Sequence, residues 1–141
     1  MSKELEKINS FLEEHHVMSL ATTHADELSV CSLFYTFHLE TTSFIVASSE
    51  DTTHIQHIKH NQNVAGNILL ETKNIGKIEG VQFRGTFSAL QEERLKALYF
   101  QKFPHARIMN PKLWQIQVNS FKMTDNTLGF GKKIIWKKPF L

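Results

Sequence analysis

The sequence predicts a mainly β protein, a barrel of six or seven mostly antiparallel strands with two or three short helices that plug it. Short β-branched, aromatic or alternating apolar stretches recur along most of the chain, as is typical of strands. The first three of these stretches are joined by connections too short for crossover helices, so neighbouring strands should run antiparallel. Glycines inside one long stretch indicate a bend of the kind that closing a barrel requires.

The composition predicts one folded domain spanning residues 1–141. With 41% hydrophobic and 21% charged residues, the chain is typical of globular proteins and not of disordered ones. A single cysteine, Cys31, excludes an intrachain disulfide framework and suits a reducing compartment. No apolar run approaches the roughly 18 residues of a membrane-spanning helix, and residues 1–9 lack the apolar core of a signal peptide. We therefore expect a cytoplasmic protein that does not associate with membranes.

The first 70 residues should form a helix, a three-stranded meander, a short helix and a fourth strand. Residues 3–15 form the first helix, because apolar side chains recur there at helical spacing. The following elements are predicted as strands over 17–23, 28–38 and 43–48, a helix over 52–60 and a strand over 64–70. The second strand is apolar almost throughout, which predicts that both of its faces are covered. Ile55 and Ile58 should form the buried stripe of the short helix.

The second half should add three strands and one helix. A long strand over 78–90 contains Gly80 and Gly85, the candidates for the bend. An amphipathic helix over 91–103 follows, with Leu95, Leu98 and Tyr99 facing inward, and Pro104 ends it. The remaining predictions are loops over 71–77 and 105–111, strands over 113–123 and 128–136, and a turn over 124–126.

Charge is distributed unevenly along the chain. Residues 1–70 contain nine acidic and three basic residues, a net of −6, whereas residues 71–141 have a net of +8. Such polarity can steer an anionic ligand or match the surfaces of two copies, but a solvated basic surface beside a solvated acidic one is the favoured explanation. Nucleic-acid binding by the basic half is a weaker alternative, because Lys132 and Lys133 fall on opposite faces of a strand.

The segment from Ser48 to His54 is the most informative candidate site. It joins the end of a strand to the start of a helix, where free backbone N–H groups and three hydroxyl side chains can hold a phosphate. A protonated His54 would add positive charge. Glu50 and Asp51 argue against this interpretation, and ordinary helix capping by Ser49 or Asp51 is the alternative.

Other chemical sites find little support in the sequence. His54, His57 and His60 recur every third residue, and this spacing drifts around a helix, so no metal site is predicted. Cys31 lies in an apolar strand without a CxxC partner and is expected to be an inert thiol. The chain contains no P-loop, no GxSxG and no GxGxxG motif. No catalytic acid, base or nucleophile is assigned.

Four segments resemble the pyridoxamine-phosphate-oxidase-like FMN-binding split barrels, most closely a short bacterial branch of that superfamily. The segments are residues 17–23 (VMSLATT), 29–35 (SVCSLFY), 48–63 (SSEDTTHIQHIKHNQN) and 81–87 (VQFRGTF). They resemble the family's first strand, its flavin-edge strand, its phosphate-binding turn and helix, and its long strand with a polar flavin contact. Thr53-His54 stands where the vitamin-synthesising oxidases typically carry an Arg-Lys pair, and their C-terminal substrate signature is absent.

The resemblance implies a homodimer with two FMN sites at its interface. The phosphate would be held by Ser48, Thr52, Thr53 and His54. The flavin ring would lie along Ser32, Leu33 and Phe34, with Gln82 as a hydrogen-bonding partner, and Trp114 or Lys133 would reach the site from the partner subunit.

A flavin supplies the redox chemistry itself, so the expected function is that of an oxidoreductase or flavin reductase acting on a small molecule of unassigned identity. The alternative is a non-catalytic module for haem or another anionic cofactor. Seven of the eight histidines lie in the first half of the chain, and histidine is a common axial ligand of haem.

Overall fold

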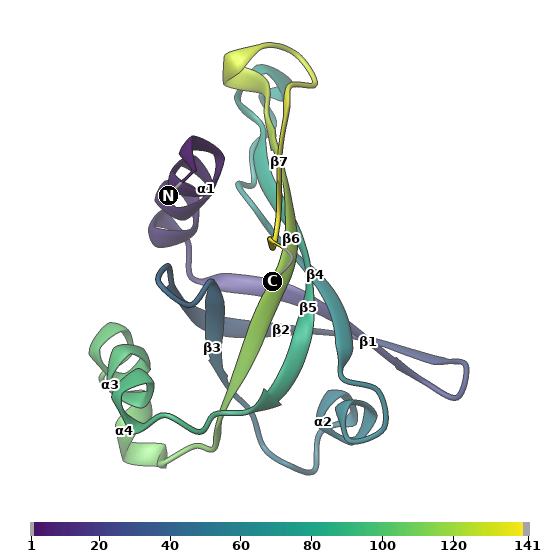
Figure 1. Cartoon of the computed structure of the whole chain (residues 1–141), viewed down its shortest axis with the longest axis vertical. Coiled ribbons are helices and arrows are strands. Elements are labelled where there is room, and N and C mark those ends of the chain that lie inside the picture. Colours follow the sequence, from purple (N-terminus) through teal and green to yellow (C-terminus); the bar gives the residue numbers. More distant parts are fainter. Residues whose placement is uncertain (1, 140–141) are drawn as a thin grey trace.

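A computed structural model describes residues 2–139; Met1, Phe140 and Leu141 of the predicted domain lie outside the described residues. Its elements, coloured along the chain in Figure 1, are α1 (Lys3–Glu14), β1 (Val17–His24), β2 (Glu27–His38), β3 (Ser43–Ala47), α2 (Thr53–Ile58), β4 (Asn63–Leu69), the 3-10 helix η1 (Ile75–Lys77), β5 (Glu79–Ala89), α3 (Glu93–Lys102), α4 (Ala106–Met109), β6 (Leu113–Asp125), the 3-10 helix η2 (Asn126–Leu128) and β7 (Lys133–Lys137). In this part of the chain no helix has the length and apolar character that crossing a bilayer demands.

The strands form one antiparallel sheet that closes on itself. Their order is β3-β2-β1-β4-β5-β6-β7, and a further pairing of β3 with β6 joins the ends of the first six strands into a ring. β7 pairs with β6 outside that ring and extends upward with it in Figure 1. The predicted class, a mainly β barrel of antiparallel strands with short helices, is confirmed, including the meander of β1, β2 and β3.

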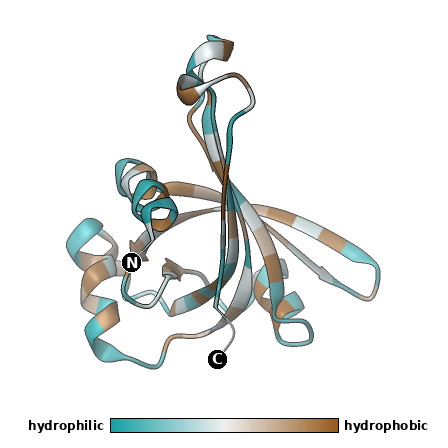
Figure 2. Cartoon of the chain, turned by 45° about the horizontal axis from the view of Figure 1, so that its top comes forward, coloured by the Kyte–Doolittle hydropathy of each residue, from teal (hydrophilic) through white to brown (hydrophobic). Residues whose placement is uncertain are grey.

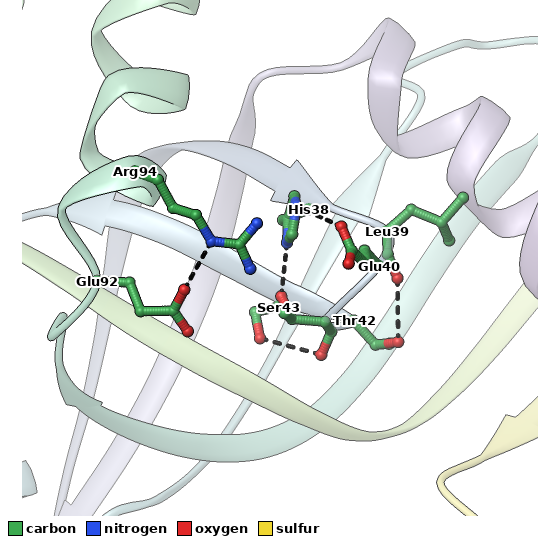
Figure 3. A network of polar contacts seen from close by, with 8 residues as sticks. His38, Leu39, Glu40, Thr42, Ser43, Glu92 and Arg94 are labelled. Atoms are coloured by element: carbon green, nitrogen blue, oxygen red, sulfur yellow. Dashed lines mark hydrogen bonds and ion pairs between the residues drawn. The ribbon is translucent and has the colours of Figure 1, made fainter.

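Buried hydrogen bonds reinforce the seam between β3 and β6. The hydroxyl of Ser43 is fully buried and accepts a bond of 2.9 Å from the Gln115 side chain. The Gln117 amide donates to the carbonyl of Thr41 at 2.9 Å. In the turn that leads into β3, shown in Figure 3, Nδ1 of His38 and the Thr41 hydroxyl are 2.8 Å apart. These bonds satisfy polar groups near the pairing of β3 with β6 that closes the ring.

Helices close the ends of the barrel. The apolar side chains that recur at helical spacing in α1, those of Leu5, Ile8, Phe11 and Leu12, are all buried. The Tyr35 hydroxyl donates to the carbonyl of Leu12 at 2.8 Å. Ile55 and Ile58 of α2 are buried as predicted. On α3, Leu95 and Tyr99 are buried in a second apolar cluster, whereas the predicted third inward residue, Leu98, is only partly buried.

The prediction that both faces of the second strand are covered is wrong for the single chain. Its burial alternates, and Leu28, Val30 and Phe34 are 82%, 74% and 54% exposed. Figure 2 shows the corresponding alternation of apolar and polar bands along the protruding β1–β2 hairpin. A barrel strand buries its inward face against the core, and on the outward face of β2 these three apolar side chains stay exposed in the described chain.

Two boundaries in the second half also differ from the prediction. The last strand begins at Lys133 and not at residue 128, because Asn126–Leu128 form η2. Gly129 and Gly131 then have φ angles of 140° and 74°, a conformation that favours glycine and belongs to a loop. The predicted loop over 105–111 contains α4, a single turn with no buried residue and therefore no apolar period to indicate it.

Gly85 marks a bulge in β5, as the sequence predicts. The register with β6 shifts between Arg84 and Gly85, whereas Gly80 lies within a regular pairing. A Cβ atom at Gly85 would lie 2.6 Å from the carbonyl oxygen of Gln117, so the two backbones approach too closely for a side chain. Glycine is therefore required at the point where β5 bends around the barrel.

We predict that Gly85→Ala lowers the free energy of unfolding by about 1–3 kcal/mol, because the backbone of β6 must move to admit the methyl group. Gly76→Ala is the control, since a Cβ there meets only the Asn74 side chain at an ordinary 3.4 Å. Urea unfolding monitored by circular dichroism measures both. Equal stability of the two variants would show that the close approach at Gly85 does not constrain the barrel.

Candidate functional site

The loop from Ser48 to Thr52 is anchored at its start by the barrel. The indole N–H of Trp114 donates to the carbonyl of Ser48 at 2.9 Å, and the N–H of Ser48 donates to the carbonyl of Lys112 at 3.1 Å. Trp114 is 4% exposed and packs against Phe87 in the core. The loop then runs below the barrel to α2 in Figure 1. Trp114 thus supports this loop from within its own chain.

Three of the four residues expected to hold a phosphate lie together in this loop. Oγ of Ser48 and Nε2 of His54 are 2.6 Å apart, and the Thr52 hydroxyl lies 3.4 Å from the same nitrogen. Thr52 caps α2 by accepting the N–H of Ile55 at 3.3 Å, so the capping residue is neither Ser49 nor Asp51. Thr53 is exposed, and within residues 2–139 its side chain makes no hydrogen bond.

His54 does not supply the positive charge expected of it. Its side chain is buried, and this burial, followed by the proximity of His57, lowers the pKa of His54 from its ordinary value of 6.5. The imidazole is therefore neutral at pH 7 and acts as a hydrogen-bonding group within the loop.

The two acidic residues of the loop differ in their surroundings. The carboxylate of Glu50 pairs with Lys112, and this hydrogen bond and charge lower the pKa of Glu50. Lys112 also lies 4.6 Å from the centre of the Trp114 ring. Asp51 is exposed. One of the two negative charges that argued against an anion site is thus offset by a cation that the sequence analysis did not consider.

A second group of predicted residues lies on the outer face of the sheet. Cross-strand pairing places Ser32 beside Ser19, Ser19 beside Asn67, and Asn67 beside Gln82. All four side chains are exposed. Strands are about 4.8 Å apart, so this polar row extends about 14 Å from Ser32 to Gln82. The structure therefore brings Ser32 and Gln82 onto one surface, separate from the loop at Ser48.

A cavity of about 720 Å³ lies over this surface. Its lining includes the small residues Ser19, Ala21, Ala65 and Gly66 of the adjacent strands β1 and β4, together with Gln82 of β5. A volume of this size is typical of sites for small molecules and cofactors.

The remaining predicted residues point in different directions. Leu33 is 9% exposed and faces the barrel interior, so only its backbone can meet a ligand on the outer face. Phe34 lies outside, with its ring 6.1 Å from that of His16 and 5.4 Å from that of Phe103. Lys133 is exposed at the start of β7 and, by alternation, shares the outward face of Lys137.

The sequence analysis missed Lys102 of α3, which lies beside β2. Its ammonium group donates to the carbonyls of His15 and Tyr35 at 2.9 and 3.1 Å and lies 4.7 Å from the centre of the Tyr35 ring. Partial burial lowers the pKa of Lys102. No local pattern could have indicated it, because its partners are distant in sequence.

A hydrogen-bonded chain of side chains was also missed. Nδ1 of His57 lies 2.8 Å from the Thr22 hydroxyl, and its Nε2 lies 2.7 Å from the Glu27 carboxylate. The bonds tie α2 to the β1–β2 hairpin. Nearby, the exposed rings of His24 and His60 stack at 4.2 Å. Within residues 2–139, no three His, Cys, Asp or Glu side chains converge as a metal site requires.

A six-stranded antiparallel ring with a polar outer face and a loop of hydroxyls at one end defines a protein of the split-barrel class. Residues 5–122 match the pyridoxamine 5'-phosphate oxidase family, and the chain belongs to that family. It is 36% identical over 137 residues to a UPF0306 protein of Klebsiella pneumoniae, covering 95% of this chain and 93% of the other. It is 36% identical over 135 residues to the UPF0306 protein YhbP of Escherichia coli, with coverages of 94% and 92%.

Solved structures share the fold at low sequence identity. A haem-binding protein of Mycobacterium smegmatis matches with a TM-score of 0.78 at 13% identity, over 97% of this chain and 59% of that one. An FAD-binding protein of Mesorhizobium loti gives 0.70 at 13% identity, over 86% and 92%. HutZ of Vibrio cholerae, a haem storage protein, gives 0.68 at 16% identity, over 81% and 89%. These likenesses show a common architecture.

The depressed pKa of His54 predicts an acid-sensitive fold. Because the unfolded chain binds a proton at this histidine more readily than the folded one does, the free energy of unfolding falls as the pH is lowered through about 6.5. His54→Gln removes this contribution, so its stability should vary less between about pH 7.5 and pH 5. Urea unfolding at several pH values measures the slope.

The exposed His60 provides the control for this test, and His60→Gln should keep the slope of the unaltered protein. An unchanged slope in His54→Gln would mean that His54 is not the group whose protonation destabilises the fold.

Proposed function

We propose that the protein is an FMN-binding flavoprotein that acts as an oxidoreductase or flavin reductase on a small molecule. The observation that carries the proposal is the row of exposed Ser32, Ser19, Asn67 and Gln82, the last three of which line a cavity of about 720 Å³. A flavin ring needs both apolar contacts and hydrogen-bonding groups at its edge, and the cavity offers both, since Ala21, Val30 and Ala65 also line it. When bound, the flavin supplies the redox chemistry, and the chain positions it and limits access to it.

The loop at the start of α2 fits the flavin phosphate as a neutral cradle. Thr53, exposed and next to Thr52 in the chain, offers a hydroxyl, and the hydroxyls of Ser48 and Thr52 are held by His54. Hydroxyl and backbone N–H donors bind phosphate without a full positive charge, although less strongly than an Arg-Lys pair would. The chain should therefore bind FMN more weakly than a relative that carries such a pair.

Membership of the pyridoxamine 5'-phosphate oxidase family supports a flavin, as does the shared fold of the FAD-binding protein of Mesorhizobium loti. Haem is the second candidate, favoured by the exposed imidazoles of His24 and His60 beside a cavity of about 290 Å³. Proteins of the same fold from Mycobacterium smegmatis and Vibrio cholerae are named for haem. The row of Ser32, Ser19, Asn67 and Gln82 on the outer face of the sheet favours the flavin. Haem does not need an extended line of amide and hydroxyl groups.

The active form in this proposal is a homodimer whose two cofactor sites lie at the interface. The outer face of β2 carries Leu28 and Val30, which are 82% and 74% exposed, and Val30 also lines the large cavity. Exposed apolar side chains in such a group are typical of protein interfaces. A second copy placed on this face would cover the apolar residues of β2 and enclose the cavity at the same time.

The interface is tested by Val30→Asp, which would bury an unpaired charge between the two copies. We expect the dimer to dissociate about a hundredfold more readily. Ile108→Asp is the control, because Ile108 is an equally exposed apolar residue (83%) that lies on α4 and not on β2. Sedimentation velocity over a range of concentrations measures both, and a dimer equally stable in both variants would exclude this face as the interface.

The phosphate cradle is tested by Thr53→Asp, which places a negative charge beside the expected phosphate. Charge repulsion should weaken FMN binding about tenfold or more, while riboflavin, which lacks the phosphate, should bind as it does to the unaltered protein. Quenching of flavin fluorescence measures all four affinities. Equal losses for FMN and riboflavin, or no loss for either, would remove the phosphate from this loop.

A further inference from the structure

Four side chains that can bind a metal ion line the cavity of about 290 Å³ between α2 and the β1–β2 hairpin. They are His24 at the end of β1, Glu27 at the start of β2, His57 of α2 and His60 just after α2. Figure 1 shows α2 below this hairpin. Three imidazoles and one carboxylate are a donor set that suits zinc and the neighbouring divalent transition metals.

The backbone presents these side chains as two close pairs. His24 and Glu27 stand directly opposite each other across the two-residue turn of the hairpin. His57 and His60 are three residues apart, and the N–H of His60 donates to the carbonyl of His57 at 3.0 Å, so the helical turn continues to it. Residues at this spacing share a face of a helix. The drift that excludes a site across all three histidines from His54 onward leaves the last two together.

His57 already has the orientation of a metal ligand. It is 4% exposed, its Nδ1 lies 2.8 Å from the Thr22 hydroxyl, and its Nε2 faces the Glu27 carboxylate at 2.7 Å. In metal sites the ring of a ligating histidine is fixed by a hydrogen bond of its second nitrogen. Thr22 is 3% exposed and can provide this bond from the core. The lone pair of Nε2 is then directed into the cavity, and Thr22 is a positioning residue.

The distances between the groups are close to those required by a shared ion. Two imidazoles on one tetrahedral zinc ion have ring centres about 5 Å apart. The ring of His24 lies 4.2 Å from that of His60 and 6.5 Å from that of His57. In the described conformation the side chains do not converge on one point. His24 and His60 are exposed, so rotation of their side chains is the change that the site requires.

We infer that this cavity binds a divalent transition metal ion such as Zn²⁺ through the imidazoles of His24, His57 and His60 and the carboxylate of Glu27. Four protein ligands leave no open position for a substrate, so the ion is structural and not catalytic. It joins the β1–β2 hairpin to α2, the helix that begins at the Ser48 loop. The site does not depend on the flavin, and it stands or fails separately from the proposed function.

Calorimetric titration of the flavin-free protein with zinc chloride tests the site, on protein that carries no polyhistidine tag. We expect one ion per chain, bound about tenfold or more weakly by His60→Gln and by Glu27→Gln, because each variant loses a ligand. Glu27→Gln keeps an acceptor for His57 and removes only the charge. His105→Gln is the matched control, since it removes an exposed imidazole that does not line the cavity.

Thr22→Val separates a built site from a chance pair of surface imidazoles. It removes the hydroxyl that orients His57 while keeping the size of the side chain, and zinc affinity should fall about tenfold. If His60→Gln weakens zinc binding but Glu27→Gln and Thr22→Val do not, exposed imidazoles alone hold the ion and the proposal is overturned. Equal weakening by His105→Gln, or no zinc binding by the unaltered protein, would also overturn it.

Discussion

The pairing of β3 with β6 is the constraint on which the rest of the molecule depends. It joins strands more than 60 residues apart and turns an open sheet into a ring around the main apolar core. The same pairing brings Trp114 against the end of β3, where its indole fixes the start of the Ser48 loop. Ring closure therefore anchors the loop of the candidate site, while the pairings of β2, β1, β4 and β5 form its polar outer face.

The Ser48 loop and the outer face of the sheet differ in charge. In the loop, His54 is neutral because it is buried, and the charge of Glu50 is offset by Lys112, so that hydroxyls and backbone N–H groups remain. On the outer face, Arg84, Lys122 and Lys137 provide positive charge with no acidic neighbour in the cavity lining. In the proposed function, hydroxyl and backbone N–H groups of the loop hold the phosphate in place of a basic pair at Thr53 and His54.

Local patterns in the sequence were sufficient for the elements and for part of the site. The period of α1 predicted its four buried residues, and Gly85 indicated the bulge, because each depends on neighbours along the chain. The burial of His54, the indole of Trp114 at Ser48 and the contacts of Lys102 depend on tertiary packing, which local patterns in the sequence do not show. Resemblance to a family suggested Ser32 and Gln82, and the register of the strands placed them on one surface. Neither the local pattern nor the resemblance showed that one face of β2 is exposed in the single chain. The apolar sequence of a strand does not show what covers each of its faces.

The most direct test of the account is the visible absorption spectrum of the protein as purified, recorded before any ligand is added and again after loading with FMN and removal of the excess. The account predicts a flavin spectrum shifted from that of free FMN, reaching one flavin per chain after loading. A colourless protein that retains no FMN would contradict it, and so would a Soret band that persists unchanged when FMN is added.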